Sequence, residues 1–104
     1  MSRYYRVNVR AKNTDEEELD NVMNGEFGWD ETQDCWEEHY VDKNNVPYIV
    51  QCFEGEGTLN GGMSEEEAYN KTLKYYKSIN PKVQLEITYT YLEDLPQSTY
   101  GGLD

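Results

Sequence analysis

Cys35, Cys52 and the single histidine, His39, are the residues of this chain whose chemistry metal sites and covalent catalysis most often use. Cys35 and His39 lie four residues apart, so their side chains would share one face of a strand. A four-residue turn at 42–45 would place Cys52 opposite Cys35, and Glu37 would complete a group of four on one hairpin. This spacing matches no common zinc pattern such as Cys-x-x-Cys. We therefore expect no metal site and no cofactor.

A cysteine nucleophile needs a lowered thiol pKa, because the thiolate is the attacking species. Asp34, Glu37 and Glu38 surround Cys35 in the sequence and would disfavour the thiolate. A disulfide from Cys35 to Cys52 is unfavourable in a reducing cytosol. Carboxylate pairs are so abundant that none stands out as an acid with its base. The residues thus give no catalytic site, and we expect that the chain is not an enzyme.

Charge is distributed unevenly along the chain. Residues 13–67 hold 17 of the 21 acidic residues and one lysine, whereas residues 1–12 and 70–82 each carry four basic residues and no acid. A net charge of −12 repels phosphate backbones and anionic membranes, so we expect no direct contact with nucleic acid and no membrane binding. Basic proteins are the natural partners. The alternative is that the acids serve solubility alone.

A single folded domain must position these acids, since 104 residues leave no room for a second one. Ten tyrosines, two tryptophans and two phenylalanines supply apolar area to bury. We expect the domain to span residues 1–92, with a tail at 93–104. Alternation of apolar and polar residues predicts strands over 4–11 and 83–91.

Two helices and a hairpin fill the space between these strands. Capping boxes that start at Thr14 and Ser64 predict the beginnings of the two helices. The helices are predicted to end at Asn24-Gly25 and Asn80-Pro81. A hairpin is predicted from 35–41 and 46–54, and its buried face is expected to carry Trp36, Tyr40, Ile49 and Phe53, with burial of the opposite face as the alternative. The order is strand, helix, strand, strand, helix, strand. It predicts an α+β fold of the ferredoxin-like βαββαβ type, a four-stranded antiparallel sheet with both helices on one face.

Two families that share this topology can be tested by their motifs. Acylphosphatases bind phosphate in a glycine-rich loop after the first strand, but residues 12–16 read Lys-Asn-Thr-Asp-Glu and contain no glycine. RNA-recognition motifs need a basic residue, a glycine and aromatics in the third strand, and residues 47–53 supply the aromatics alone. Fold alone does not fix function, so neither activity follows.

The small size, acidity, tyrosine content and lack of motifs resemble, in character, phage and mobile-element inhibitors of nucleic-acid-targeting enzymes, such as anti-restriction and anti-CRISPR proteins. Carboxylates at high density imitate the charge of a nucleic acid and attract the lysines and arginines that normally bind phosphate. The hypothesis is a DNA mimic that occupies the nucleic-acid channel of a basic protein such as a defence nuclease. The expected contact residues are Asp15, Glu16, Glu17, Glu18, Asp20, Glu26, Asp30, Glu31, Asp34, Glu37 and Glu38.

An alternative function is a small dimeric regulatory or ligand-sequestering module. It would use the open face of the sheet, where Tyr4, Arg6 and Tyr48 could hold a partner or an anion.

The first residues contain no apolar stretch typical of a secretory signal, and the longest apolar run, 46–50, is far too short to cross a bilayer. A cytoplasmic location is therefore expected, which would be the host cytosol for a phage-encoded chain.

Overall fold

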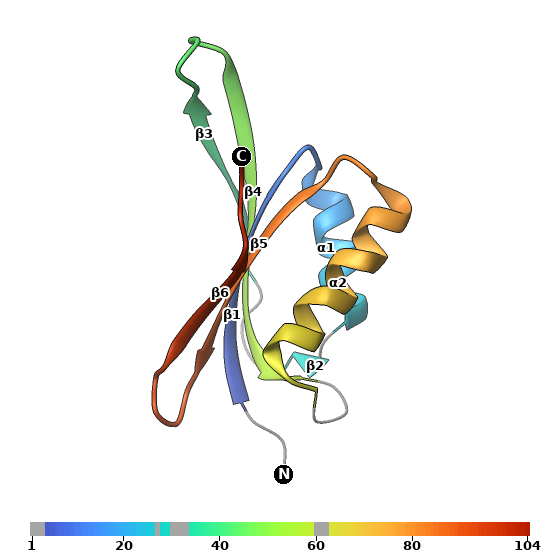
Figure 1. Cartoon of the computed structure of the whole chain (residues 1–104), viewed down its shortest axis with the longest axis vertical. Coiled ribbons are helices and arrows are strands. Elements are labelled where there is room, and N and C mark those ends of the chain that lie inside the picture. Colours follow the sequence, from blue (N-terminus) through green and yellow to red (C-terminus); the bar gives the residue numbers. More distant parts are fainter. Residues whose placement is uncertain (1–3, 27, 30–33, 60–62) are drawn as a thin grey trace.

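The chain folds into an α+β structure in which an antiparallel sheet packs against two helices. The computed structural model describes residues 4–26, 28–29, 34–59 and 63–104. The elements in chain order are β1 (Tyr4–Lys12), α1 (Glu16–Glu26), β2 (Gly28–Trp29), β3 (Asp34–Val41), β4 (Pro47–Thr58), α2 (Glu65–Ile79), β5 (Gln84–Tyr91) and β6 (Gln97–Gly101). Both helices lie on the same side of the sheet (Figure 1).

Strand β1 pairs with one edge of β4. Strands β2 and β3 pair with different parts of the other edge of β4. On the far side, β1 pairs with β5 and β5 pairs with β6, and every pairing is antiparallel. Within the described residues, the sheet thus contains six strands in five positions. The predicted count of four is wrong, because β2 and β6 were not predicted.

Strand β6 lies within residues 93–104, the segment predicted to be a tail. It pairs with β5 from Glu86–Gly101 to Thr90–Gln97. Its one large apolar residue, Tyr100, stacks on Tyr69 of α2 at 6.1 Å between ring centroids and meets the edge of Tyr89 at 5.8 Å. Backbone pairing and one aromatic anchor therefore hold a strand that has no apolar alternation of its own.

The core lies between the sheet and the helices, and alternation in the strands builds it. The predicted strands β1 and β5 are confirmed, and each buries alternate residues on the helix-facing side. Burial of these side chains is the main stabilising contribution, at roughly 25 cal/mol per Å² of apolar surface. The core residues from β1, β5, α1 and α2 are Tyr5, Val7, Val9, Ala11, Leu85, Ile87, Tyr89, Leu19, Val22, Met23, Ala68, Tyr69 and Tyr76.

Capping interactions define where both helices begin. Ser64 accepts a hydrogen bond from the Glu67 amide, and the Glu67 carboxylate accepts one from the Ser64 amide, so the predicted capping box of α2 is confirmed. Helix α1 is capped by Asp15, whose carboxylate accepts the Glu18 amide at 2.8 Å. The predicted start at Thr14 is wrong by one residue, because the Thr14 hydroxyl donates to the Glu18 side chain instead.

The predicted β3–β4 hairpin forms, but its register differs by one residue. Asp42 donates its amide to Val46 O, and Asn45 adopts a left-handed φ of 60°. The loop is therefore three residues long, 43–45, rather than the four that were predicted. Cys35 consequently lies opposite Phe53.

A one-residue change of register moves alternate side chains to opposite faces of the sheet. Phe53 is fully buried under the helices, as predicted. The prediction that Trp36, Tyr40 and Ile49 are buried with it is wrong, because all three remain well exposed.

Candidate functional site

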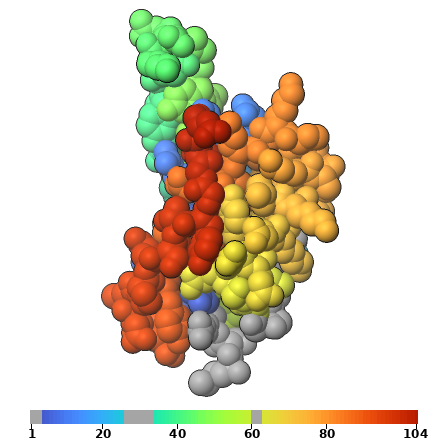
Figure 2. All heavy atoms as spheres, in the orientation of Figure 1, coloured from blue at the N-terminus to red at the C-terminus, as the bar shows by residue number. Residues whose placement is uncertain are grey.

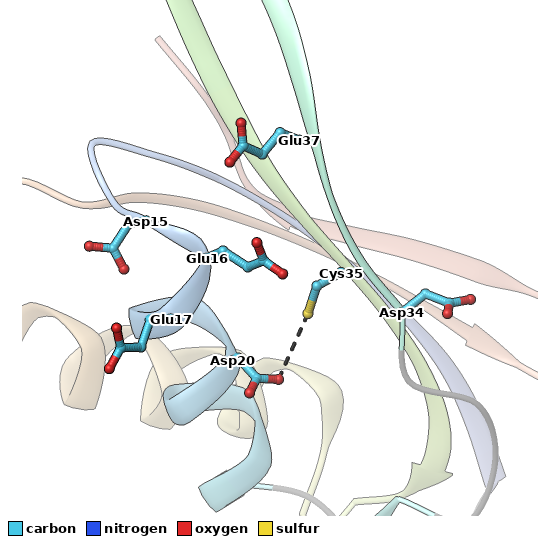
Figure 3. A pocket seen from close by; sticks show the side chains of 7 residues that line it. All are labelled: Asp15, Glu16, Glu17, Asp20, Asp34, Cys35 and Glu37. Atoms are coloured by element: carbon cyan, nitrogen blue, oxygen red, sulfur yellow. Dashed lines mark hydrogen bonds between the residues drawn. The ribbon is translucent and has the colours of Figure 1, made fainter.

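An open cleft of about 700 Å³ lies between the N-terminal half of α1 and strand β3. Six carboxylates and one thiol line it, and Figure 3 shows the group from close by. We call it the acidic cleft. Its lining residues are Asp15, Glu16, Glu17, Asp20, Asp34, Cys35 and Glu37.

Helix periodicity and strand alternation create the acidic cleft. Leu19, Val22 and Met23 are buried against the sheet, so the acidic first turn of α1 projects outward. In β3, Cys35 and Glu37 are two residues apart and share the helix-facing side. Carboxylates cannot be buried unpaired, and here they stand at a solvent-open cleft instead.

The anionic surface continues around the first turn of α1. A smaller hollow of about 290 Å³ shares Asp15 and Glu17 with the acidic cleft and also borders Glu18, Asn21 and Ile79. Seven of the eleven predicted contact residues thus border one of two hollows that share residues. The structure brings together Asp15, Glu16, Glu17, Glu18, Asp20, Asp34 and Glu37.

The other four predicted contact residues are not among those that the structure places at the two hollows. Glu38 lies on the opposite face of the sheet, where its carboxylate is 3.6 Å from the Arg10 guanidinium, so the structure does not place it with the acidic cleft. The side chain of Glu26, together with Asp30 and Glu31, falls outside the part of the chain that the structure describes.

Glu18 also has a structural role. Its carboxylate accepts hydrogen bonds from the Thr14 hydroxyl at 2.9 Å and from the Asn80 amide group at 2.7 Å. Thr14 in turn bonds the hydroxyl of the buried Tyr76. These contacts join the start of α1 to the end of α2, so Glu18 is the least suitable member of the group for binding a partner.

Cys35 lies among the carboxylates of the acidic cleft. Its thiol donates to Asp20 Oδ1 at 3.8 Å, a contact drawn in Figure 3. Burial raises the pKa of the Cys35 thiol to about 11, and the negative charges of Asp20, Glu16 and Asp34 add to the effect. A thiol in this environment is a weak nucleophile.

Cys52 lies on the other face of the sheet, because it pairs with Trp36 rather than with Cys35. Burial also raises the pKa of its thiol to about 11, with Glu38 as the next cause. The two thiols are free. The proposed meeting of Cys35, His39, Glu37 and Cys52 on one side of the hairpin is therefore wrong. Among the described residues, no three or more His, Cys, Asp or Glu side chains are arranged to hold a metal ion.

The cations of β1 lie on the open face of the sheet, away from the helices. Arg6 pairs with Glu56 at 2.8 Å, and Arg10 lies 3.6 Å from Glu38 and 3.7 Å from Glu86. These arginines therefore neutralise carboxylates other than those of the acidic cleft. On the cleft side, His39 lies 3.4 Å from the Glu37 carboxylate.

Aromatic side chains complete the open face. Tyr40 and Tyr48 stack at 5.5 Å between ring centroids, and the Lys12 ammonium lies 4.4 Å from the centre of the Tyr48 ring. Sequence reasoning missed this cluster, because the predicted register placed Tyr40 and Tyr48 on opposite faces. The residue that could have indicated the correct register is Asn45, because asparagine tolerates the left-handed conformation that closes a three-residue loop.

Comparisons with protein-family models, with curated proteins and with solved structures found no match for this chain. In the part of the chain that the structure describes, neither helix has the length and apolar character needed to cross a membrane.

Proposed function

We propose that this chain is a small acidic inhibitor that binds a basic nucleic-acid-processing protein in place of its nucleic acid. The observation that supports the proposal most is the acidic cleft, where six carboxylates from two separate elements border one open hollow. The arginines of β1 do not reduce this charge, because they pair with acids on the other face. The chain acts by binding and not by catalysis.

Charge density is the physical basis of this mimicry. Duplex DNA carries one negative charge per about 1.7 Å of its axis. The acidic cleft presents its carboxylates from the N-terminal half of α1 and from the neighbouring strand, at a hollow that is open to solvent. Lysines and arginines that normally contact phosphate would pair with them, and long-range attraction would speed association.

We also propose that the core of the fold is ferredoxin-like. Along the sheet, β3, β4, β1 and β5 are consecutive neighbours, and α1 and α2 are the connections that follow β1 and β4. Strands β2 and β6 would then be additions at the two sides of this core. This arrangement leaves the α1–β3 boundary accessible, which is where the acidic cleft lies.

A competition assay with two charge-matched variants tests the inhibitor function. The cleft variant carries Glu16→Gln, Glu17→Gln, Asp34→Asn and Glu37→Gln, whereas the control variant carries four exposed changes elsewhere: Glu66→Gln, Glu93→Gln, Asp94→Asn and Asp104→Asn. Both have a net charge four units less negative than the native chain. Each protein is titrated into complexes of labelled duplex DNA with purified restriction and CRISPR nucleases.

The native chain and the control variant should displace DNA from a susceptible nuclease, and the cleft variant should need at least about tenfold more protein. Displacement should weaken steeply as salt rises from about 50 to about 300 mM, because salt screens exposed charges. Equal displacement by both variants would show that the acidic cleft is not the binding surface.

The open-face alternative has less structural support. It needs Arg6 to be available to an anion, whereas Glu56 holds Arg6 through an ion pair at 2.8 Å and a hydrogen bond from its Nε at 2.9 Å. Arg10 is similarly engaged by Tyr40, Glu38 and Glu86.

A further inference from the structure

The outer half of the β3–β4 hairpin projects beyond the rest of the sheet (Figure 1). The last pairing of β1 with β4 joins Ala11 to Gln51, and Asn13, with a left-handed φ of 64°, then turns the chain toward α1. Beyond this point β3 and β4 pair with each other alone among the described residues. The projecting hairpin forms the green extension in Figure 2, and the molecule measures 47 Å along its longest axis.

Large apolar side chains of this hairpin are exposed to solvent. Five of the eight large hydrophobic residues that are exposed among the described ones belong to the hairpin, and Val41 and Ile49 are 61% and 43% exposed. A two-stranded hairpin is marginally stable in water by itself. The extension is therefore a surface that would gain stability from a partner.

The free edge of β3 carries three charged residues, Asp34, Glu37 and Glu38, but lacks other devices that prevent strand pairing. It contains no proline and no lysine, and its pairing with β4 runs through eight consecutive residues without a bulge. Asp42 donates its amide to Val46 O, so even-numbered residues of β3 face β4 and odd-numbered residues point their backbone groups outward. Cys35, Glu37, His39 and Val41 thus point backbone groups outward at an edge where the described part of the chain supplies no pairing strand.

Charge indicates which partner can approach this edge. The extension, residues 38–50, contains Glu38, Asp42 and Lys43, so its formal charge is −1 in a chain with a net charge of −12, and Glu38 lies 3.6 Å from the Arg10 guanidinium. The extension is consequently a surface at which two copies of this chain repel each other only weakly. A second copy also carries the same unpaired edge and the same exposed apolar residues.

We propose that two copies of this chain form a dimer by antiparallel pairing of their β3 edges, with the two-fold axis at His39. In antiparallel pairing the odd-numbered residues, whose backbone groups point outward, lie opposite each other, so the two-fold axis can pass through any residue from 37 to 41 near the middle of the exposed edge. An axis at Glu37 or at Glu38 would place two glutamates opposite each other, and an axis at Tyr40 would place Glu38 opposite Asp42, so these registers are unfavourable. An axis at Val41 would leave only the end of the strand to pair.

The axis at His39 also separates the two acidic clefts. Glu37 lies opposite Val41 of the other copy, so the two Glu37 residues are about four strand positions, or roughly 13 Å, apart. That distance exceeds the Debye length of about 8 Å at physiological salt. Asp34 and α1 lie still farther from the axis, so the bodies of the two copies point in opposite directions.

Sedimentation velocity across a concentration series tests the dimer. The native chain should change from 12.2 kDa to twice that mass, and higher salt should not weaken the association. His39→Lys would place two lysines opposite each other at the axis and should return the mass to that of the monomer. Ser98→Lys adds the same charge to the exposed strand β6 at the other edge and should leave the dimer intact.

Cysteine cross-linking tests the register independently. His39→Cys should form an intermolecular disulfide on mild oxidation, because residues facing each other across a hydrogen-bonded pair have Cα atoms about 5.5 Å apart. Glu37→Cys, roughly 13 Å from its counterpart, should give no more cross-linked dimer than the native chain with its own cysteines.

A native chain that stays monomeric at high salt and at several hundred micromolar would overturn the proposal. The partner of the hairpin would then be a different protein. A dimer that His39→Lys does not dissociate, in a variant that circular dichroism shows to be folded, would also overturn it. So would cross-linking by Glu37→Cys as efficient as by His39→Cys. None of these results depends on binding to a nuclease, so the dimer can fail while the inhibitor function stands.

Discussion

Cys35 shows how far sequence reasoning reaches at the scale of a single residue. Its acidic neighbours in the sequence predicted that the thiolate would be disfavoured, and the direction of the pKa shift is confirmed. The causes differ from the prediction. Burial comes first, and Asp20 and Glu16 from α1 contribute more than the sequence neighbour Asp34. Contacts between separate elements depend on packing, and local sequence does not contain them.

The raised pKa of Cys35 predicts slow alkylation. At pH 8 a thiol with a pKa of about 11 is about 0.1% thiolate, whereas an ordinary cysteine is roughly a quarter ionised. The rate with iodoacetamide, followed by mass spectrometry, should therefore rise with pH up to about 11. Asp20→Asn removes the negative charge that lies 3.8 Å from the thiol but keeps an oxygen acceptor there, so it should lower the pKa and speed the reaction several-fold at pH 8.

Glu66→Gln is the matched control, because Glu66 is exposed on α2 and does not line the acidic cleft. It should leave the alkylation rate of Cys35 unchanged. If the native chain reacted at pH 8 as fast as a model thiol peptide, the environment described for Cys35 would be wrong.

At the scale of elements, strong periodicity was predictable and turn geometry was not. The alternation in β1 and β5, and the capping box at Ser64, led directly to the observed elements. The hairpin was found but its register was missed, because one residue in the left-handed conformation, Asn45, shortens the loop.

Strand β6 was missed for a different reason. Its sequence, Gln-Ser-Thr-Tyr-Gly, has no alternation, and its position depends on a β5 edge and on the surface that Tyr69 and Tyr89 offer to Tyr100. Pairing with an existing sheet can order a segment whose own preference for a strand is weak.

Gly101 provides a test of how β6 is fixed. Its φ is 77°, and a methyl group there would collide with the Tyr69 hydroxyl and with the backbone oxygen of Leu85, which the same hydroxyl bonds at 2.7 Å. Gly101→Ala should lower the free energy of unfolding by about 1–3 kcal/mol, measured by urea denaturation. Gly102→Ala meets no atom within 4 Å and should change it by less than about 0.5 kcal/mol. Equal effects of the two substitutions would contradict the described position of β6.

At the scale of the whole molecule, the sequence predicted an anionic surface but could not define its members. The rotation of α1 and the face on which each β3 residue lies decide which carboxylates come together. The rotation depends on the helix cap and the face depends on the hairpin register, and each of these differs by one residue from the prediction. As a result Glu38 pairs with Arg10 on the open face, while Asp34 and Glu37 join the first turn of α1 at the acidic cleft. The separation of the arginines of β1 from the carboxylates of the acidic cleft is a property of the folded chain.

The affinity of an oligoarginine peptide for the two charge-matched variants tests most directly whether the acidic cleft is a binding surface for basic groups. Isothermal titration calorimetry at low salt, with a nine-residue oligoarginine, compares the native chain with the cleft variant and the control variant. Because both variants carry the same net charge, a difference between them reports the position of the carboxylates and not their number. The account predicts that the cleft variant loses at least about tenfold more affinity than the control variant. Equal losses would contradict it, since the negative charge would then act as a diffuse property of the whole surface.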